Sequence, residues 1–138
     1  SGADITSNLE RNDTSFSHIG TGMSQSSGIF TFPSTGIYLI DFCASASTTS
    51  SSDINYVGGR IKITTDNSSY SDVAEQFNSR TTHSSTYYFS ANMKIFFDVT
   101  NVSTHKVKFY VLSSAAVNFQ GSTSENRTHM TFIRLGDT

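Results

Sequence analysis

The stretch at residues 28–42, GIFTFPSTGIYLIDF, decides the fold. Its centre, Pro-Ser-Thr-Gly at residues 33–36, predicts a turn, because proline presets φ and glycine tolerates positive φ. The residues on both sides of this turn are aromatic, aliphatic or β-branched, which are the types enriched in strands. The stretch therefore predicts two strands joined by a short turn.

The rest of the chain extends this pattern. Short apolar segments alternate with loops rich in Ser, Thr, Asn and Gly, a spacing that predicts an all-β sandwich. We expect strands at residues 16–19, 28–32, 37–45, 54–65, 87–99, 106–112 and 129–135. Segment 72–82 is expected to be a further strand or a loop, in preference to a turn of helix capped by Asp72 and Glu75.

The domain boundary is expected near the start of the chain. Residues 1–15 are polar and lack periodicity, which predicts an N-terminal arm or linker before one head domain at residues 16–138. The tract 45–53 has no large apolar anchor and predicts a loop. Cys43 is the single cysteine, so we expect a buried, unpaired thiol and no cysteine-based zinc site.

Composition excludes several classes of function. Charged residues make up 14% of the chain and the net charge is −2, with no basic patch, so we expect no nucleic-acid partner. No apolar run approaches the length of a membrane span, so we expect no membrane insertion. Catalytic and metal-binding motifs are absent, and the histidines are scattered, at His18, His83, His105 and His129. We therefore expect a binding or display protein with no catalytic residues, and a hydrolase is the least favoured alternative.

Some strands are apolar on one face and others on both. Residues 60–64 (Arg-Ile-Lys-Ile-Thr) alternate strictly, which predicts one core face and one face toward water. By contrast, residues 37–40, 95–97 and 130–135 carry apolar side chains at both odd and even positions. A sandwich strand has only one core face. We interpret the second apolar face as an interface with another copy of the chain; the alternative is ordinary central strands with a few surface hydrophobes.

The same stretch carries a family resemblance. The globular heads of the first complement component, with their tumour-necrosis-factor relatives, show Gly-x-Phe-x-x-Pro-x-x-Gly-x-Tyr-x-Phe-x-Phe at this place. Residues 28–42 resemble this signature, with Ile40 standing where an aromatic residue is usual. Residues 131–137 look like the closing Gly-Phe-Leu-Leu strand of the family, with Thr131 for the glycine and Arg134 for a leucine. The positions that match the first motif are Gly28, Phe30, Pro33, Gly36, Tyr38 and Phe42.

The resemblance implies an antiparallel two-sheet jelly-roll sandwich of about ten strands that forms a homotrimer around a threefold axis. We assign the strand faces from the charged residues, because Asp41 shares a face with Ile37 and Leu39, and Arg134 shares a face with Met130 and Phe132. The expected trimer interface comprises Ile37, Leu39, Asp41, Tyr88, Phe96, Met130, Phe132 and Arg134. The expected core comprises Phe30, Tyr38, Ile40, Phe42, Phe97, Phe109 and Ile133.

Two expectations concern charged groups at this interface. We hypothesise that Asp41 and Arg134 pair within or across subunits, since an unpaired charge there would be costly. We expect no cofactor and no metal site within one chain. The one alternative is calcium on the threefold axis, where some family members bind it and where three copies of Asp41 would form a ring.

Three polar loops are the expected ligand-binding elements. They run from Ser45 to Tyr56, from Ser79 to Ser85 and from Phe119 to Thr128. Hydroxyl and amide groups hydrogen-bond adaptably and tyrosine offers a stacking face, so these loops suit recognition of a sugar or a protein; the alternative is ordinary solvated loops.

The expected function is a structural and receptor-recognition module of a virus particle. The low lysine content, the Ser/Thr/Asn-rich strands and the lack of disulfides are similar to bacteriophage fibre or knob proteins that carry this fold. Such a module would trimerise on the virion surface and bind a host-surface polysaccharide or protein. The alternative is an extracellular carbohydrate- or protein-binding head of a cellular organism, secreted or on a spore surface.

Overall fold

A computed structural model of the chain describes residues 1–11, 18–81 and 84–138. These residues form ten strands and no helix. The strands are β1 (Gly2–Asp4), β2 (Ser24–Ser26), β3 (Ile29–Thr31), β4 (Gly36–Thr48), β5 (Ile54–Thr64), β6 (Ser71–Arg80), β7 (Tyr87–Val99), β8 (Lys106–Ser113), β9 (Asn118–Phe119) and β10 (His129–Gly136). The all-β prediction is confirmed.

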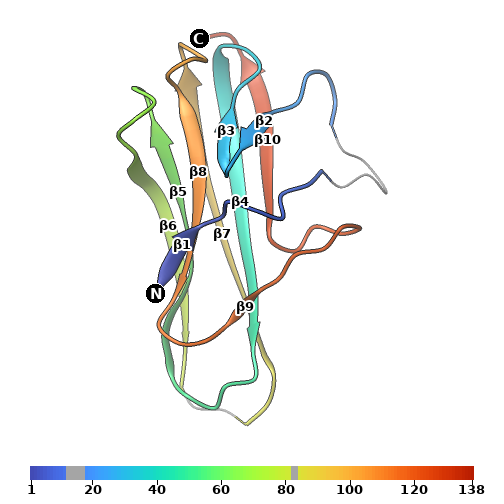
Figure 1. The fold of residues 1–138 in the computed structure, drawn as a ribbon, viewed down its shortest axis with the longest axis vertical. Coiled ribbons are helices and arrows are strands. Elements are labelled where there is room, and N and C mark those ends of the chain that lie inside the picture. The colour runs from blue at the N-terminus through green and yellow to red at the C-terminus, as the bar shows by residue number, and fades with distance from the viewer. Residues whose placement is uncertain (12–17, 82–83) are drawn as a thin grey trace.

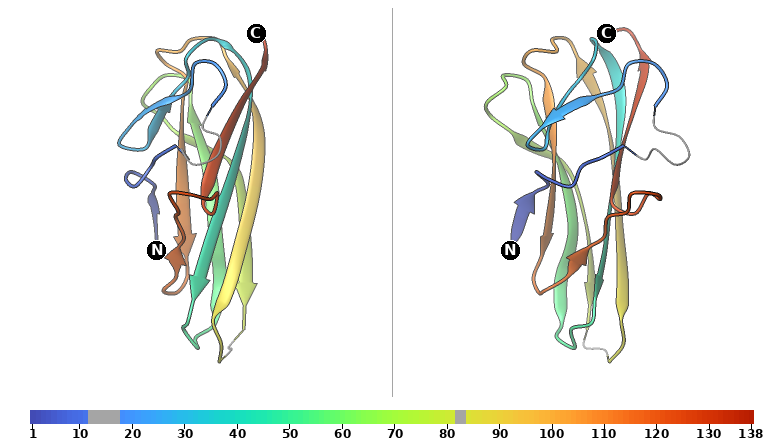
Figure 2. Two further views of the ribbon diagram at one scale, coloured as in Figure 1. Left: turned by 90° about the vertical axis from the view of Figure 1, so that its right-hand side faces the viewer. Right: turned by 45° about the vertical axis from the view of Figure 1, so that its right-hand side comes forward.

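The strands form two antiparallel sheets that pack face to face (Figures 1 and 2). One sheet has the order β2-β3-β8-β5-β6, with β1 added along β8, and we call it the charged sheet for its outer face. The other has the order β10-β4-β7, with β9 beside one end of β4, and we call it the β4 sheet. In both sheets most pairs of neighbouring strands are far apart in the sequence.

The chain passes repeatedly between the two sheets. It begins in the charged sheet with β1, β2 and β3, crosses to β4, returns for β5 and β6, crosses to β7, returns for β8 and finishes in the β4 sheet with β9 and β10. The crossings therefore gather the loops at the two ends of the sandwich. The β4–β5 and β6–β7 connections lie at the end opposite the C-terminus (Figure 1).

Aromatic side chains from both sheets fill the core. The Phe42 ring of β4 lies 4.9 Å from the Phe109 ring of β8, centroid to centroid, and Ile40 beside it is fully buried. Burial of apolar surface and many small dispersion contacts stabilise an interior that is packed in this way. The expected core residues that are buried are Phe30, Tyr38, Ile40, Phe42, Phe97 and Phe109.

The two faces of β10 are the reverse of the prediction. The register pairs Phe132 with Ile40 and Ile133 with Leu39, and directly paired residues share a face. Ile133, expected in the core, therefore points outward and is 48% exposed. Phe132, expected at the interface, packs into the core 5.3 Å from the Phe30 ring, and Met130 also contacts that cluster.

Two other segments differ from expectation. β4 continues through Ala46 and Thr48, both buried, so the tract predicted as a loop from residue 45 begins as strand. Residues 2–4, within the predicted arm, form β1 along β8, and the amide of Ile5 donates to the carbonyl of Phe109. Of the strand predicted at residues 16–19, positions 16–17 lie outside the described residues, and no strand forms at 18–19. Segment 72–82 is strand β6 as far as Arg80.

Candidate functional site

The outer face of the β4 sheet carries an apolar row. The registers place Leu39 of β4 between Ile133 of β10 and Phe96 of β7, with all three side chains on the outer face. Phe96 is 73% exposed. Ile37 and Leu135 are exposed at the adjoining end of the same strands. We call these five residues the outer apolar patch; contiguous apolar patches of this kind mark interaction sites.

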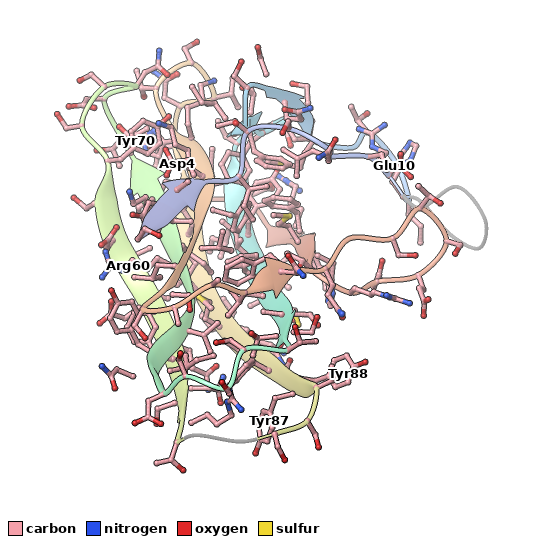
Figure 3. All side chains as sticks on the ribbon, turned by 60° about the horizontal axis from the view of Figure 1, so that its bottom comes forward. Asp4, Glu10, Arg60, Tyr70, Tyr87 and Tyr88 are labelled. Carbon is pink, nitrogen blue, oxygen red and sulfur yellow. The ribbon has the colours of Figure 1, made fainter. Side chains whose placement is uncertain are left out.

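The outer face of the charged sheet is different. Arg60 of β5 pairs with both Asp72 and Glu75 of β6, at 3.0 and 3.1 Å. Asp4 of β1 lies 3.5 Å from the amino groups of both Lys62 and Lys108. Asp4 and Arg60 lie on the same side of the sandwich (Figure 3). The outer face of the charged sheet thus combines ion pairs with the Phe77 and Tyr110 rings beside Arg60, whereas the outer apolar patch consists of aliphatic and aromatic groups alone.

The charged residues expected at the interface find other partners. Asp41 lies on the outer face beside the patch, where its Oδ2 is 3.3 Å from the Nζ of Lys94. Arg134 lies on the opposite face of the sheet, where Nε donates to the carbonyl of Thr35 and Nη2 pairs with Asp137. The Asp41–Arg134 pair therefore does not form within one subunit, because the two side chains leave opposite faces.

The sheet places the remaining expected interface residues in two groups. Ile37, Leu39, Asp41, Tyr88 and Phe96 lie on the outer face of the β4 sheet, as the registers of β4 and β7 require. Tyr88 is exposed and lies with Tyr87 at the loop end of the sandwich (Figure 3), away from the outer apolar patch. Met130, Phe132 and Arg134 belong to the other face.

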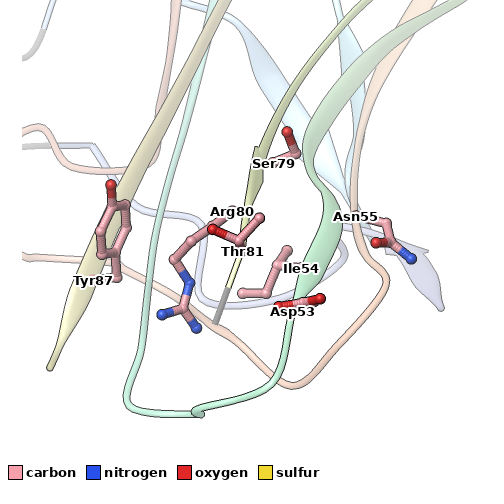
Figure 4. Close-up of a pocket in the computed structure, with 7 residues that line it drawn as sticks. All are labelled: Asp53, Ile54, Asn55, Ser79, Arg80, Thr81 and Tyr87. Atoms are coloured by element: carbon pink, nitrogen blue, oxygen red, sulfur yellow. The ribbon is translucent and has the colours of Figure 1, made fainter. Parts of the chain in front are cut away.

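Two of the three expected ligand loops meet at an open pocket of about 560 Å³. The pocket lies at the end of the sandwich opposite the C-terminus, and Figure 4 shows the Arg80 guanidinium between Tyr87 and the start of β5. Ile54 and Arg80 are paired in the β5–β6 register, which fixes the two walls relative to each other. The lining residues are Asp53, Ile54, Asn55, Ser79, Arg80, Thr81 and Tyr87.

Arg80 is the most unusual side chain of this pocket. It is 7% exposed, and its Nη2 donates to the carbonyls of Ser50 and Ser52 at 2.6 and 3.2 Å. Its guanidinium carbon lies 5.3 Å from the centroid of the Tyr87 ring, a cation–π distance. The Nε and Nη1 atoms are buried and have no hydrogen-bond partner among the residues that the structure describes.

The third expected ligand loop lies apart from this pocket and projects from the side of the sandwich (Figure 1). Its base is tied to β4, because the Thr128 hydroxyl donates to the carbonyl of Ser45 and the Gln120 amide donates to the same carbonyl. Arg127 and Glu125 pair with each other at its exposed tip.

A fourth polar turn, between β5 and β6, is organised around Asp66. Its carboxylate accepts hydrogen bonds from the Thr64 hydroxyl at 2.7 Å and from the amides of Ser69 and Ser68. These donors hold the pKa of Asp66 well below its ordinary value, with the Thr64 hydroxyl as the largest cause. Nearby, burial raises the pKa of Tyr70, with Asp4 and Asp66 adding to the effect.

Two of the histidines have defined hydrogen-bond surroundings. His105 is buried, its ring nitrogens lie within hydrogen-bond distance of the Thr100 and Thr104 hydroxyls, and the ring stacks on Phe97. His129 lies at the start of β10, and His83 is outside the described residues. Among residues 1–11, 18–81 and 84–138, no cluster of three or more His, Cys, Asp or Glu side chains is arranged to hold a metal ion.

The sequence matches no protein-family model, and comparison with curated proteins finds no significant match. Where the structure describes the chain, it contains no helix long and apolar enough to cross a membrane. The functional reading therefore depends on the outer apolar patch and the pocket at the loop end.

The sequence indicated the loops that form the pocket but not its central residue. Arg80 closes strand β6 in a tract of Ser, Asn and Thr, and nothing in that tract marks the arginine as buried. Its burial depends on the β4–β5 loop, whose carbonyls of Ser50 and Ser52 lie about thirty residues earlier in the chain and cover its Nη2.

Proposed function

We propose that this chain is a non-enzymatic recognition head that forms a homotrimer through the outer face of the β4 sheet and binds a host-surface polysaccharide or protein at its loop end. The outer apolar patch carries the proposal. Covering it removes the exposed phenyl group of Phe96 and the adjoining Leu39 and Ile133 side chains from water, which is favourable in proportion to the apolar area buried.

Further copies of the same chain are the proposed cover. The patch lies on the one outer face that lacks a network of ion pairs, and Asp41 and Lys94 at its edge offer charges of both signs to a copy.

The jelly-roll and family proposals are supported by strand order and by the first motif. In a jelly roll the chain passes repeatedly between two antiparallel sheets, as it does here between β3 and β9, although β5 and β6 form a pair within the charged sheet. Of the motif residues, Phe30, Tyr38 and Phe42 are buried, and Gly36 opens β4 after the turn. The similarity to complement and tumour-necrosis-factor heads in turn supports three copies in preference to two.

We place the head on a virion surface, as the tip of a bacteriophage fibre or knob. The support is the resemblance of its Ser/Thr/Asn-rich, disulfide-free composition to phage heads of this kind. The second candidate, an extracellular or spore-surface head of a cellular organism, is favoured by the same fold resemblance. A capsid or tail gene neighbourhood would support the first, and a collagen-like stalk in the full-length protein the second.

The experiment is a native mass measurement of the chain and two matched variants. Phe96→Asp places a charge in the outer apolar patch, whereas Phe77→Asp places one at a partly exposed phenylalanine of the charged sheet. We expect the wild type and Phe77→Asp to have the mass of a trimer and Phe96→Asp to have the mass of a folded monomer. A wild-type monomer at micromolar concentration, a dimer, or a trimer that survives Phe96→Asp would refute the proposed assembly.

A further inference from the structure

A buried positive charge without a negative partner lies at the loop end of the sandwich. Arg80 is 7% exposed, and none of the ion pairs among the described residues involves it. Backbone carbonyls satisfy Nη2 alone, which leaves Nε and Nη1 buried with donors unused. A buried donor of a charged group that lacks a partner is costly, so such a group in a native structure calls for an explanation.

The position of this charge gives the explanation. The guanidinium stands in the wall of a pocket of about 560 Å³, within the size range of small-molecule sites. Guanidinium groups match carboxylates in shape as well as in charge. A carboxylate in the pocket would balance this charge, and it would accept the unused hydrogens once the guanidinium turns out of the wall, because Nε and Nη1 are themselves buried.

Most of the other lining groups suit the rest of a sugar, and the Asp53 carboxylate in the same lining can accept hydrogen bonds from sugar hydroxyls. The Tyr87 ring, 40% exposed, offers an aromatic face beside the guanidinium. The Asn55 amide of β5, the Ser79 hydroxyl of β6 and the hydroxyl of Thr81, which follows β6, belong to exposed residues and give both donors and acceptors for sugar hydroxyls. A simple inorganic anion would use the arginine but not these groups.

We propose that this pocket is a binding site for an acidic monosaccharide unit, whose carboxylate pairs with Arg80 and whose ring lies against Tyr87. The inference builds on the recognition part of the proposed function and names its ligand class; it does not depend on trimer formation. A host-surface polysaccharide containing uronic or sialic acid units would supply such a ligand.

The test is a titration followed by backbone amide NMR, with D-glucuronate, D-galacturonate and N-acetylneuraminate as probes. The methyl ester of each acid, which keeps the ring and removes the charge, is the matched neutral ligand, and acetate tests the carboxylate alone. We expect shifts at Asn55, Ser79 and Thr81 with at least one acid, and binding at least about tenfold weaker for its ester and for acetate.

Variants locate the binding group. Arg80→Gln should weaken the acid at least about tenfold and leave the ester unchanged. Because this change also removes the bonds to Ser50 and Ser52, Tyr87→Ala, which leaves those bonds in place, is the second variant and should weaken acid and ester alike. Arg127→Gln, at an exposed arginine of the loop that projects from the side, is the control and should bind as the wild type does.

The outcomes separate this inference from the broader proposal. Equal affinity for an acid and its ester, no loss in Arg80→Gln, or no shifts at the pocket with all three acids would overturn the acidic-sugar site. If neutral glycans or a host protein bind elsewhere on the head, recognition stands and only this site is wrong. If a wider panel of host-surface polysaccharides and proteins also fails to bind, the recognition function fails as well.

Discussion

Phe96 and Phe97 are neighbours in β7 that point to opposite faces of the β4 sheet. Phe96 is 73% exposed and Phe97 is 6% exposed, so the same substitution at each should have different effects. Phe97→Ala leaves a cavity among Phe32, Tyr38 and His105 and should lower the free energy of unfolding by about 3–5 kcal/mol. With an unfolding entropy of roughly 2 cal/mol/K per residue, the melting temperature should fall by roughly 10–17 °C.

Phe96→Ala should act on association alone. Fully burying a phenylalanine contributes about 1.5–3 kcal/mol, and roughly three-quarters of this side chain is open to be covered. The loss is then about 1–2 kcal/mol per subunit and about 3–6 kcal/mol per trimer, which lowers the association constant by roughly two to four powers of ten. The intrinsic stability of one subunit should change by less than about 0.5 kcal/mol.

Urea titrations at several protein concentrations distinguish the two effects. The stability of an associating chain rises with concentration, whereas that of a monomer does not. Phe97→Ala should shift the midpoint downward at every concentration, and Phe96→Ala should abolish or strongly reduce the concentration dependence. Equal losses for both variants at the lowest concentration would refute the assignment of faces. A wild type whose midpoint does not depend on concentration would refute the self-association of the outer apolar patch.

Two further predictions concern turns. Gly28 has φ +78°, and a Cβ there would lie 2.1 Å from the carbonyl oxygen of Ile5, so Gly28→Ala should lower the free energy of unfolding by at least about 1 kcal/mol. The control is Gly121→Ala, because Gly121 has open space around it. Equal stability of the two variants in urea would contradict the prediction. The depressed pKa of Asp66 means that its stabilising contribution is present above its ordinary pKa of 3.8 and is lost as the pH falls toward the folded-state pKa. Asp66→Asn should therefore flatten the loss of stability below about pH 4 in urea titrations, and an unchanged acid limb would show that the Thr64 and Ser69 bonds do not persist in solution.

Alternation of polar and apolar residues predicts the strands well where one face of the sheet is exposed to solvent. The alternating residues at 60–64 lie in β5 with Ile61 buried and Arg60 paired outward, and the prediction for β7 has the same bounds as the strand. The alternation in each strand shows which of its faces is apolar, and such patterns predict two antiparallel sheets.

A charged residue misled the assignment of faces in β10. The charge of Arg134 predicts that its face is the less buried one, yet Arg134 shares its face with the core residue Phe132. At the end of the sandwich its long side chain reaches past the core to the carbonyl of Thr35 and to Asp137. Which groups a side chain near a strand end can contact depends on the register of the strands, and the register cannot be read from the sequence of one strand.

The sequence also fails to predict the end of β4, because the residues there are small. Ala46 and Thr48 gave no apolar signal, but they are buried because β7 pairs with them through Phe89 and Tyr87. The pocket around Arg80 depends likewise on residues 50–55 and 79–87 meeting in space, so the sequence indicated the loops without their joint geometry.

The order of strands in the β4 sheet has a consequence for synthesis of the chain. β4 is apolar along much of its length, but both of its main partners, β7 and β10, are made later, and β10 begins at His129 near the end of the chain. On the ribosome β4 therefore emerges as an unpaired strand, exposed to other nascent chains until β7 and β10 have followed it. Folding should be slow and dominated by this non-local pairing, so yield in recombinant expression should improve at low temperature or with added chaperones.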